Sequence, residues 1–424
     1  MANLDAGNGE CGAILVVGGG IAGVTCAIEA AEAGSQVFLV EKSAYLGGHV
    51  AAFHRYFPKL CPPPCGLEIN FRRLQNSPRI TVFTQAELES LSGGPGNYEA
   101  VLKIAPRFVT AACTSCGDCG RVCPVEIPDV FNCGITKTKA ARLPHRMAFP
   151  AQYAIERNAC ADGCSLCAES CRYNAIDLQQ RESRKTLHVA SVVVATGWAP
   201  YDAARIDNLG FGRYGNVVTN AMLERMAAAD GPTGGKIVRP TDGKAPRAVA
   251  FVQCAGSRDR NHLPYCSGVC CTASIKQAGY IRSQYPEAKI AMFYIDLRTP
   301  GHLDAFAARE IAANGIELIK GKVGEVKEQP VSRDLLLTAE DILNRRKIAR
   351  EYDLVVLAVG IVPQTSGLPA GVALDEFGFA ADGGPGVYAA GCVKRPAEVA
   401  VSIRDATGAA LKAMQGVAGG PDHG

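Results

Sequence analysis

The densest group of chemically active side chains is a set of cysteines at regular spacings. One run follows the pattern C-x2-C-x2-C-x3-C before Pro124, and a second run has the same pattern with its first gap one residue longer. Thiolates at these spacings hold three corners of one cubane, while the fourth cysteine of each run reaches the other cluster. We therefore predict two 4Fe–4S clusters, one on Cys113, Cys116, Cys119 and Cys171 and the other on Cys160, Cys164, Cys167 and Cys123.

Zinc is the alternative ligand for these thiols. It also takes four thiolates, but its structural sites usually pair two separated C-x2-C knuckles, so clusters are favoured. Cys133 lies between the runs and is predicted to be an ordinary buried thiol. Cys61 and Cys65 flank three prolines and could form a redox disulfide, although a structural role is at least as good an interpretation.

A second chemical signal is a glycine-rich turn, Gly18-Gly19-Gly20-Ile21-Ala22-Gly23, of the form G-x-G-x-x-G. In a dinucleotide site, the first glycine permits the turn, the second admits the pyrophosphate and the third allows helix and strand to pack closely. The helix N-terminus attracts the phosphates. Glu41 ends the next strand, where it can accept both ribose hydroxyls and would repel a 2′-phosphate. A glycine turn without a dinucleotide is disfavoured because strand, turn, helix and acid are all present.

Three further segments favour FAD over NAD. A Gly-Gly pair follows Glu41 closely, VVVATG ends at Gly197, and GVYAAG ends at Gly391. Similar segments return to the flavin in flavoproteins with two dinucleotide domains. Cys392 stands where an Asp usually follows the last of these segments, which leaves the ribityl contact open. The predicted FAD residues outside the turn are Glu41, Lys42, Gly47, Gly48, Ala195, Thr196, Gly197, Gly391 and Cys392.

A third group of cysteines lies where a reductase of this kind would bind NAD(P)H. The strand 249–253 runs into no second G-x-G-x-x-G but into a C-x11-C-x3-C-C pattern. We predict a third 4Fe–4S cluster here, with a buried group of free thiols as the alternative. Without the glycine turn, NAD(P)H is not the expected electron donor. The predicted ligands are Cys254, Cys266, Cys270 and Cys271.

The elements that must position these residues form an α/β fold. Apolar runs at 13–17, 37–40 and 191–195 predict buried parallel strands of an FAD-binding domain, and runs at 248–253, 290–295 and 354–358 predict a second α/β domain. These elements predict an α/β flavoprotein with two dinucleotide-type domains and an inserted two-cluster ferredoxin-like domain. The predicted domains are 10–107, 181–240 and 363–424 for FAD binding, 108–180 for the insert, and 241–362 for the degenerate NAD-type domain.

Composition excludes several other classes. The chain has 424 residues and a formal net charge of +3, which gives no reason to expect nucleic acid or an anionic membrane as the main partner. No Lys or Arg precedes Lys42, so no secretory signal is expected, and the uncharged stretch 13–28 is too short to span a bilayer. The chain has eighteen cysteines, and most of them cluster at metal-ligand spacings, which indicates reduced thiolates in the cytoplasm rather than disulfides.

From residue 14 to about residue 413 the chain resembles the A subunits of heterodisulfide reductase and their relatives. The motifs that carry the resemblance are FVQCAGSRDRNHLPYCSGVCC (251–271), FPKLCPPPCGLEIN (57–70), FYIDLRTPG (293–301) and AAGCVKRP (389–396). Within this family it most resembles the A subunit of the quinone-interacting membrane-bound oxidoreductase complex.

The resemblance implies a thioredoxin-reductase-like fold with FAD, a cluster on the third cysteine group close to the flavin, and partner subunits. The partners would be a related flavoprotein iron–sulfur B subunit, together with a membrane-bound haem and iron–sulfur C subunit. The complex would relay electrons between menaquinone and adenylylsulfate reductase in dissimilatory sulfur metabolism, with this oxidoreductase subunit peripheral to the inner membrane. Electron bifurcation at the flavin rests on the resemblance alone.

Other functions stay open from the sequence. The first is that of the corresponding subunit in a soluble heterodisulfide-reductase-like complex, which acts on thiol, disulfide or bound sulfur substrates. A stand-alone NAD(P)H reductase is disfavoured by the missing second glycine turn. An iron–sulfur sensor would need a DNA- or partner-binding module, and neither a basic patch nor a helix-turn-helix pattern is present. No catalytic residue is predicted.

Overall fold

The computed structural model describes residues 12–368, 372–384 and 386–418, so the outer limits of the predicted domains 10–107 and 363–424 lie outside the described residues. The chain forms two compact units. Unit 1 comprises residues up to 51, 63–198 and those from 363, and unit 2 comprises 52–62 and 199–362. Each unit is built around its own parallel sheet.

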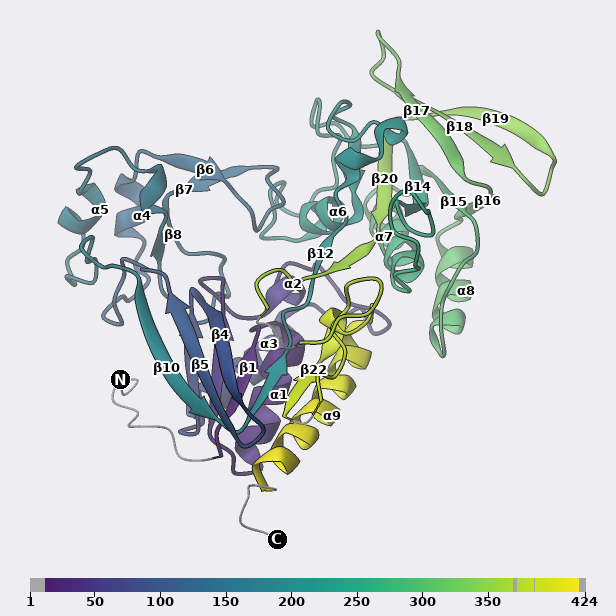
Figure 1. Cartoon of the computed structure of the whole chain (residues 1–424). Helices are drawn as coiled ribbons and strands as arrows, with labels where there is room; N and C mark the ends of the chain where they lie inside the picture. The colour runs from purple at the N-terminus through teal and green to yellow at the C-terminus, as the bar shows by residue number, and fades with distance from the viewer. Residues whose placement is uncertain (1–11, 369–371, 385, 419–424) are drawn as a thin grey trace. The chain divides into compact units, whose positions relative to one another are not determined.

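The sheet of unit 1 has five parallel strands in the order β22-β11-β1-β2-β3. Its residues are almost wholly apolar because a parallel sheet is covered on both faces. One face packs against a smaller antiparallel sheet, while α1, which contacts α9 and α3, lies on the other (Figure 1). The five strands are β1 (Ile14–Val17), β2 (Val37–Glu41), β3 (Ile80–Thr84), β11 (Ser191–Val194) and β22 (Val387–Ala389). The helices are α1 (Ile21–Glu32), α2 (Gly48–Ala51), α3 (Pro64–Asn76) and α9 (Val399–Ala418).

The smaller sheet of unit 1 supports the cysteine-rich insert. Its strands are β4 (Ala86–Gly94), β5 (Asn97–Ile104) and β10 (Ser183–Val189), in the order β10-β5-β4. The chain leaves this sheet at Ile104 and returns opposite it at Ser183. Between them lie short elements, in which α4 packs on α5 (Figure 1). They are α4 (Asp118–Val122), β6 (Glu126–Pro128), β7 (Lys137–Lys139), β8 (Ala141–Arg142), β9 (Ala154–Ile155) and α5 (Leu166–Glu169).

Unit 2 repeats the parallel-sheet plan. Its strand order is β13-β20-β14-β15-β16, and a three-stranded antiparallel sheet shares its hydrophobic core. The parallel strands are β13 (Val217–Thr219), β14 (Ala248–Ala255), β15 (Lys289–Tyr294), β16 (Glu317–Lys320) and β20 (Leu354–Val359). The antiparallel strands are β17 (Val323–Glu328), β18 (Leu335–Asp341) and β19 (Arg346–Tyr352), and the helices are α6 (Asn220–Ala227), α7 (Cys270–Gln284) and α8 (Leu303–Ala313). β12 (Trp198–Pro200) pairs with β21 (Ile361–Pro363).

One predicted domain boundary differs from the structure. Residues 199–240, predicted as part of the FAD-binding domain, belong to unit 2, because β13 adds to the unit 2 sheet beside β20. The segment 52–62 also belongs to unit 2. A buried Lys276–Glu224 ion pair holds the segment 52–62 in unit 2. Lys276 Nζ donates to the Arg55 carbonyl at 2.6 Å, and Glu224 accepts the backbone N–H groups of His54 and Arg55.

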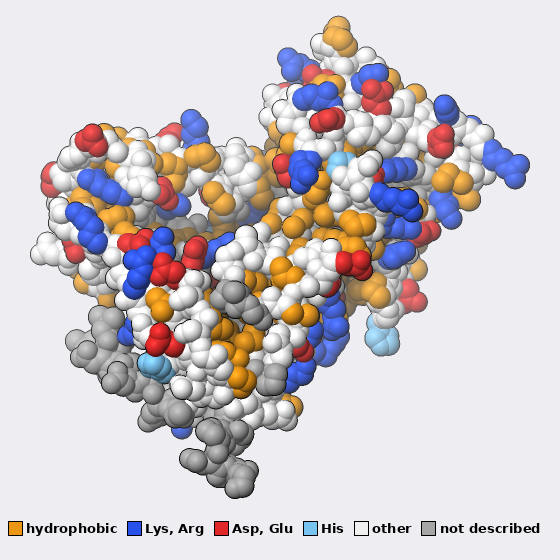
Figure 2. Space-filling model, viewed as in Figure 1, with side chains coloured by type: hydrophobic (Ala, Val, Ile, Leu, Met, Phe, Trp, Pro, Cys, Tyr) orange, Lys and Arg blue, Asp and Glu red, His pale blue; other side chains and the backbone are white. Residues whose placement is uncertain are grey.

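The visible surface carries both signs of charge. On the face shown in Figure 2, Lys and Arg side chains are interspersed with Asp and Glu side chains. Among the described residues, no helix is both long and apolar enough to cross a membrane.

Candidate cofactor sites

The glycine turn between β1 and α1 is shaped by close backbone contacts. Gly18 has φ of +111°, and a Cβ at this position would overlap the Ala195 carbonyl oxygen. A Cβ at Gly23 would overlap the carbonyl oxygen of Gly18. Both positions therefore require glycine for packing within the protein.

Gly20 has a different environment. A Cβ added there would meet no atom within 4 Å, so the backbone at this position faces open space. Gly47 and Gly48 lie beside the turn, because the Gly47 N–H donates to the Gly19 carbonyl at 2.8 Å and a Cβ on Gly48 would come within 3.0 Å of the Gly20 Cα. The turn thus has a packed side and an open side, and the open side lies at the start of α1, where a phosphate is attracted.

Glu41, at the end of β2, is fixed by backbone donors. Its Oε2 accepts the Gly19 N–H at 2.7 Å, and its Oε1 accepts the Ser43 N–H at 2.6 Å. Each carboxylate oxygen keeps a further lone pair for another donor. The side chain is only half-buried, so it could still accept ribose hydroxyls, while Lys42 beside it is exposed.

The segment after β11 also meets the turn. The Ala195 N–H donates to the Val17 carbonyl at 2.7 Å, and Thr196 Oγ1 donates to the Gln364 carbonyl at 2.6 Å. Gly197 follows with φ of +75° and open space on its Cβ side. The structure therefore brings the predicted 195–197 segment to the same place as the glycine turn.

At the end of β22, the Gly391 backbone contacts Asp405, a residue that the sequence motifs do not identify. Asp405 Oδ2, on α9, accepts the Gly391 N–H at 2.8 Å, and a Cβ on Gly391 would come within 2.8 Å of the Ala22 Cβ. Cys392 instead donates to the Ala397 carbonyl at 3.2 Å, and burial raises the pKa of its thiol. No motif spacing could have identified Asp405, because it lies 14 residues beyond Gly391.

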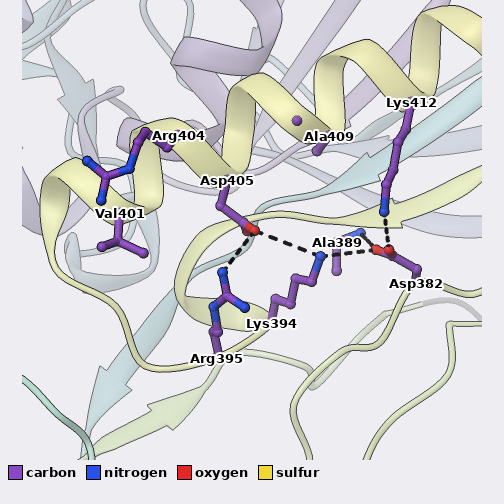
Figure 3. Close-up of a pocket in the computed structure, with 10 residues that line it drawn as sticks. Asp382, Ala389, Lys394, Arg395, Val401, Arg404, Asp405, Ala409 and Lys412 are labelled. Carbon is purple, nitrogen blue, oxygen red and sulfur yellow. Dashed lines mark hydrogen bonds and ion pairs between the residues drawn. The ribbon is translucent and has the colours of Figure 1, made fainter. Parts of the chain in front are cut away.

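Asp405 borders a charged cavity of about 420 Å³ between α9 and the segments around β22 (Figure 3). Lys394 lies between two carboxylates, 3.8 Å from Asp405 and 3.5 Å from Asp382. Arg395 reaches Asp405 at 3.5 Å, and Lys412 reaches Asp382 at 2.7 Å. These ion pairs fix the carboxylate that holds Gly391.

The ferredoxin-type cysteines lie in and around one small core. Cys119, Cys123 and Cys167 are buried in it, and Cys113 and Cys160 pack against it. Two backbone N–H groups point at sulfur, from Ser115 to Cys113 Sγ at 3.5 Å and from Ala175 to Cys171 Sγ at 3.3 Å. Burial raises the pKa of Cys119 to about 12 and also raises that of Cys167. Cys116 is exposed, and Cys164 is half-buried.

Cys133, Cys61 and Cys65 are among the cysteines that lie outside the predicted cluster groups. Cys133 is predicted to be buried, but it is exposed, because it occupies a left-handed position (φ of +55°) in the turn 129–134. Cys61 and Cys65 form no disulfide and belong to different units. Among the described residues, no three His, Cys, Asp or Glu side chains surround a single point as the ligands of one metal ion would.

The third cysteine group lines one small cavity of unit 2. Cys254 lies near the end of β14, Cys266 lies in the loop, and Cys270 and Cys271 open α7. All four border this cavity together with Ser257 and Arg258. The Gly268 N–H points at Cys266 Sγ at 3.4 Å. Burial raises the pKa of all three thiols at positions 254, 270 and 271, and the Arg258 guanidinium opposes the rise at Cys254.

The connection from β14 to α7 is not a dinucleotide turn. Residues 256–269 separate the strand from the helix. Cys254, at the end of β14, and Arg258, in this connection, both adopt left-handed backbone conformations, with φ of +55° and +58°. A tight G-x-G-x-x-G turn would place the helix N-terminus directly after the strand. Here cysteines occupy that helix start instead.

Residues 13–60 match the model of the FAD-dependent oxidoreductase family. The chain is 36% identical to the A subunit of the ferredoxin/F420H2-dependent CoB–CoM heterodisulfide reductase of Methanosarcina acetivorans, over 95% of this chain and 53% of that one. It is 35% identical to the A subunit of the H2:CoB–CoM heterodisulfide,ferredoxin reductase of Methanothermobacter marburgensis, over 94% and 63%. An iron–sulfur A subunit of the CoB–CoM heterodisulfide reductase of Methanopyrus kandleri is 36% identical, over 96% and 64%. The chain thus spans between half and two thirds of the length of these relatives.

Among solved structures, thioredoxin reductases share the fold. That of T. acidophilum gives a TM-score of 0.51 at 17% identity, over 95% of this chain and 97% of that one. That of Lactococcus lactis gives 0.51 at 13% identity, over 96% and 99%. These likenesses confirm the predicted thioredoxin-reductase-like fold class, and they do not test the ferredoxin-like insert.

Proposed function

Because the chain belongs to the family of heterodisulfide reductase A subunits, we propose that it is the FAD- and iron–sulfur-carrying electron-transfer subunit of an oxidoreductase complex. The observation that carries the proposal is the combination of an open glycine turn with three groups of cysteines in one chain. Flavin supplies two-electron chemistry and the clusters supply one-electron steps, while the protein contributes positioning and electrostatics.

The residues of unit 1 fit the adenine dinucleotide half of FAD. Gly20 leaves room for a pyrophosphate against the backbone, and the start of α1 favours its negative charge. Glu41 is oriented by two backbone N–H groups, so it would hold the ribose without reorganisation. Ala195–Gly197 and Gly391 close the site from neighbouring strands.

The donor chemistry of the cysteine groups fits iron–sulfur clusters. A single zinc would need four sulfurs about 2.3 Å from one point. A cubane binds each thiolate at a different iron, so its ligands need not surround a single point. The cluster ligands proposed here are the eight cysteines of the insert and the four around the unit 2 cavity.

Two kinds of complex are candidates for the assembly that contains this subunit. The names of the similar proteins favour a soluble heterodisulfide-reductase-like assembly acting on thiol, disulfide or bound sulfur substrates. The second candidate is the quinone-interacting complex, with its flavoprotein B subunit, its membrane-bound C subunit, and its link from menaquinone to adenylylsulfate reductase. The resemblance of the loop from Cys61 to Cys65 is what favours this candidate.

Anaerobic purification from the native host tests both the electron-transfer role and the identity of the complex. We expect FAD and iron in the preparation and no rapid flavin bleaching by NADH or NADPH alone, because the second glycine turn is replaced. Colourless material without flavin and iron would refute the electron-transfer role. Co-purifying disulfide-cleaving subunits support the first assembly, and a haem-containing membrane subunit supports the second.

A further inference from the structure

The cavity lined by the four unit 2 cysteines also receives two polar side chains that lack partners. Ser257 is 3% exposed, and its Oγ is buried without any hydrogen-bond partner. Arg258 Nη1 is likewise buried without a partner. A buried hydroxyl or guanidinium that satisfies no acceptor is costly, so each such group in a folded protein calls for an explanation.

The Arg258 side chain is held in place at the cavity. Its Nη2 donates to Asp296 Oδ2 at 2.9 Å, which leaves Nη1 as the unpaired donor. The backbone of Arg258 has φ of +58°, a conformation that a long side chain adopts at a cost. A fixed guanidinium on a strained backbone is a feature that the surrounding structure must maintain.

Two other serines of the same region show that burial alone does not produce an unpartnered polar atom at the cavity. Ser267 also lines the cavity, but its Oγ accepts the Ile361 N–H at 2.8 Å. Ser274 on α7 is fully buried with an unpaired hydroxyl, yet it is not among the cavity-lining residues. Among the described residues that line the cavity, Ser257 and Arg258 are thus those with a buried side-chain polar atom that takes part in no hydrogen bond.

We propose that Ser257 and Arg258 donate hydrogen bonds to the sulfur atoms of the cluster on Cys254, Cys266, Cys270 and Cys271 and raise its reduction potential. The proposal rests on the third cluster of the proposed function. Sulfur is the acceptor class because thiolate sulfurs border the same cavity. Both residues are positioning and tuning groups, and neither is a ligand.

The direction of the effect follows from charge. Reduction adds one electron to the cluster, breaks no bond and makes the total charge of cluster and thiolates more negative by one. Hydrogen-bond donors and a guanidinium stabilise the more negative form, so they favour reduction. Loss of either group should therefore make the potential more negative.

Redox titration of the cluster by electron paramagnetic resonance, on the full chain with its cofactors, tests the proposal. The signal of this cluster is identified as the one lost, together with iron, in Cys266→Ala. We expect Ser257→Ala and Arg258→Gln each to lower its reduction equilibrium constant by roughly threefold to tenfold, where tenfold corresponds to about 59 mV for one electron. Ser257→Thr, which keeps a hydroxyl, and Arg258→Lys, which keeps a charge, should recover part of the loss.

Matched controls are Ser274→Ala, which removes a buried unpaired hydroxyl away from the cavity, and Arg350→Gln, which removes a cation paired with Glu317. Neither should shift the potential. An unchanged potential in Ser257→Ala and Arg258→Gln at full iron content overturns the tuning role and leaves the proposed function intact. If Cys266→Ala loses neither iron nor a signal, the third cluster itself is wrong, and the tuning role falls with it.

Discussion

At the scale of single residues, the glycines of the turn meet two different requirements, which are close packing within the protein and open space beside the backbone. The sequence motif does not distinguish them. A Cβ at Gly23 overlaps the Gly18 carbonyl oxygen, whereas a Cβ at Gly20 meets nothing. Gly23 therefore serves the packing of helix on strand, whereas Gly20 leaves the open space in which we propose that the FAD pyrophosphate binds. Substitution can tell the two apart.

We expect Gly23→Ala to lower the free energy of unfolding by about 1–3 kcal/mol through overpacking. Gly20→Ala should change it by less than about 1 kcal/mol, since only the N-cap preference is altered, but should weaken FAD binding at least tenfold. Urea unfolding of the flavin-free chain and a fluorescence titration with FAD measure the two effects. A stable, fully flavin-binding Gly20→Ala protein would show that the open side of the turn is not the cofactor side.

The residues that the sequence predicts for the flavin site each have a local reason. Gly18 and Gly23 belong to one turn, and Glu41 closes the next strand at a typical distance. Asp405 could not be predicted, since its contact with Gly391 depends on how α9 docks. The predicted burial of Cys133 is wrong because cysteine is usually buried, while the left-handed turn exposes this one.

At the scale of elements, Arg107 joins the insert to the rest of unit 1. Its guanidinium donates to the carbonyls of Ala44 at 2.7 Å, Gln152 at 3.1 Å and Tyr153 at 3.0 Å, and to Thr84 Oγ1 at 3.0 Å. Burial lowers the pKa of Arg107 to about 10, so the side chain stays charged at neutral pH.

Arg107→Met should lower the free energy of unfolding by about 3 kcal/mol, because it strands several half-buried carbonyls at once. Arg184→Met is the matched control, since Arg184 on β10 pairs with Glu89 in solvent and its loss should matter little. Chemical denaturation and limited proteolysis of the insert measure both variants. Equal stability of the two would mean that the insert is held mainly by other contacts.

Which elements could be predicted depends on their signal in the sequence. Continuous apolar runs such as 13–17 and 354–358 predict buried parallel strands, and the structure has strands there at 14–17 and 354–359. β13 has three residues and gives no periodic signal, which is why the predicted boundary places the segment around it in the wrong unit. β19 contains several exposed charged residues, so no apolar run predicts it as a strand.

At the scale of the whole molecule, the chain leaves the antiparallel sheet of unit 1 for the insert and returns to it at the same end of the β5–β10 ladder. Ile104 and Ser183 are opposite each other in the β5–β10 ladder. A chain in which a short Asn-Gly turn replaces residues 105–182 should therefore keep the host sheet.

We expect that shortened chain to bind FAD stoichiometrically and to lose the iron of two clusters. Flavin absorbance and iron analysis after anaerobic purification measure both quantities, with the full-length chain as reference. A shortened chain that aggregates while Arg107→Met remains folded would mean that the insert supplies part of the core of unit 1.

The bond between Asp405 and Gly391 bears on how flavoproteins are recognised from sequence. Searches that demand an aspartate directly after the last glycine pass over chains such as this one, in which Cys392 takes that position and a helix docked from further along brings a carboxylate to the amide of Gly391. A search pattern that allowed an acidic residue about two helical turns into the C-terminal helix would detect this class of chain without loosening the rest of the signature.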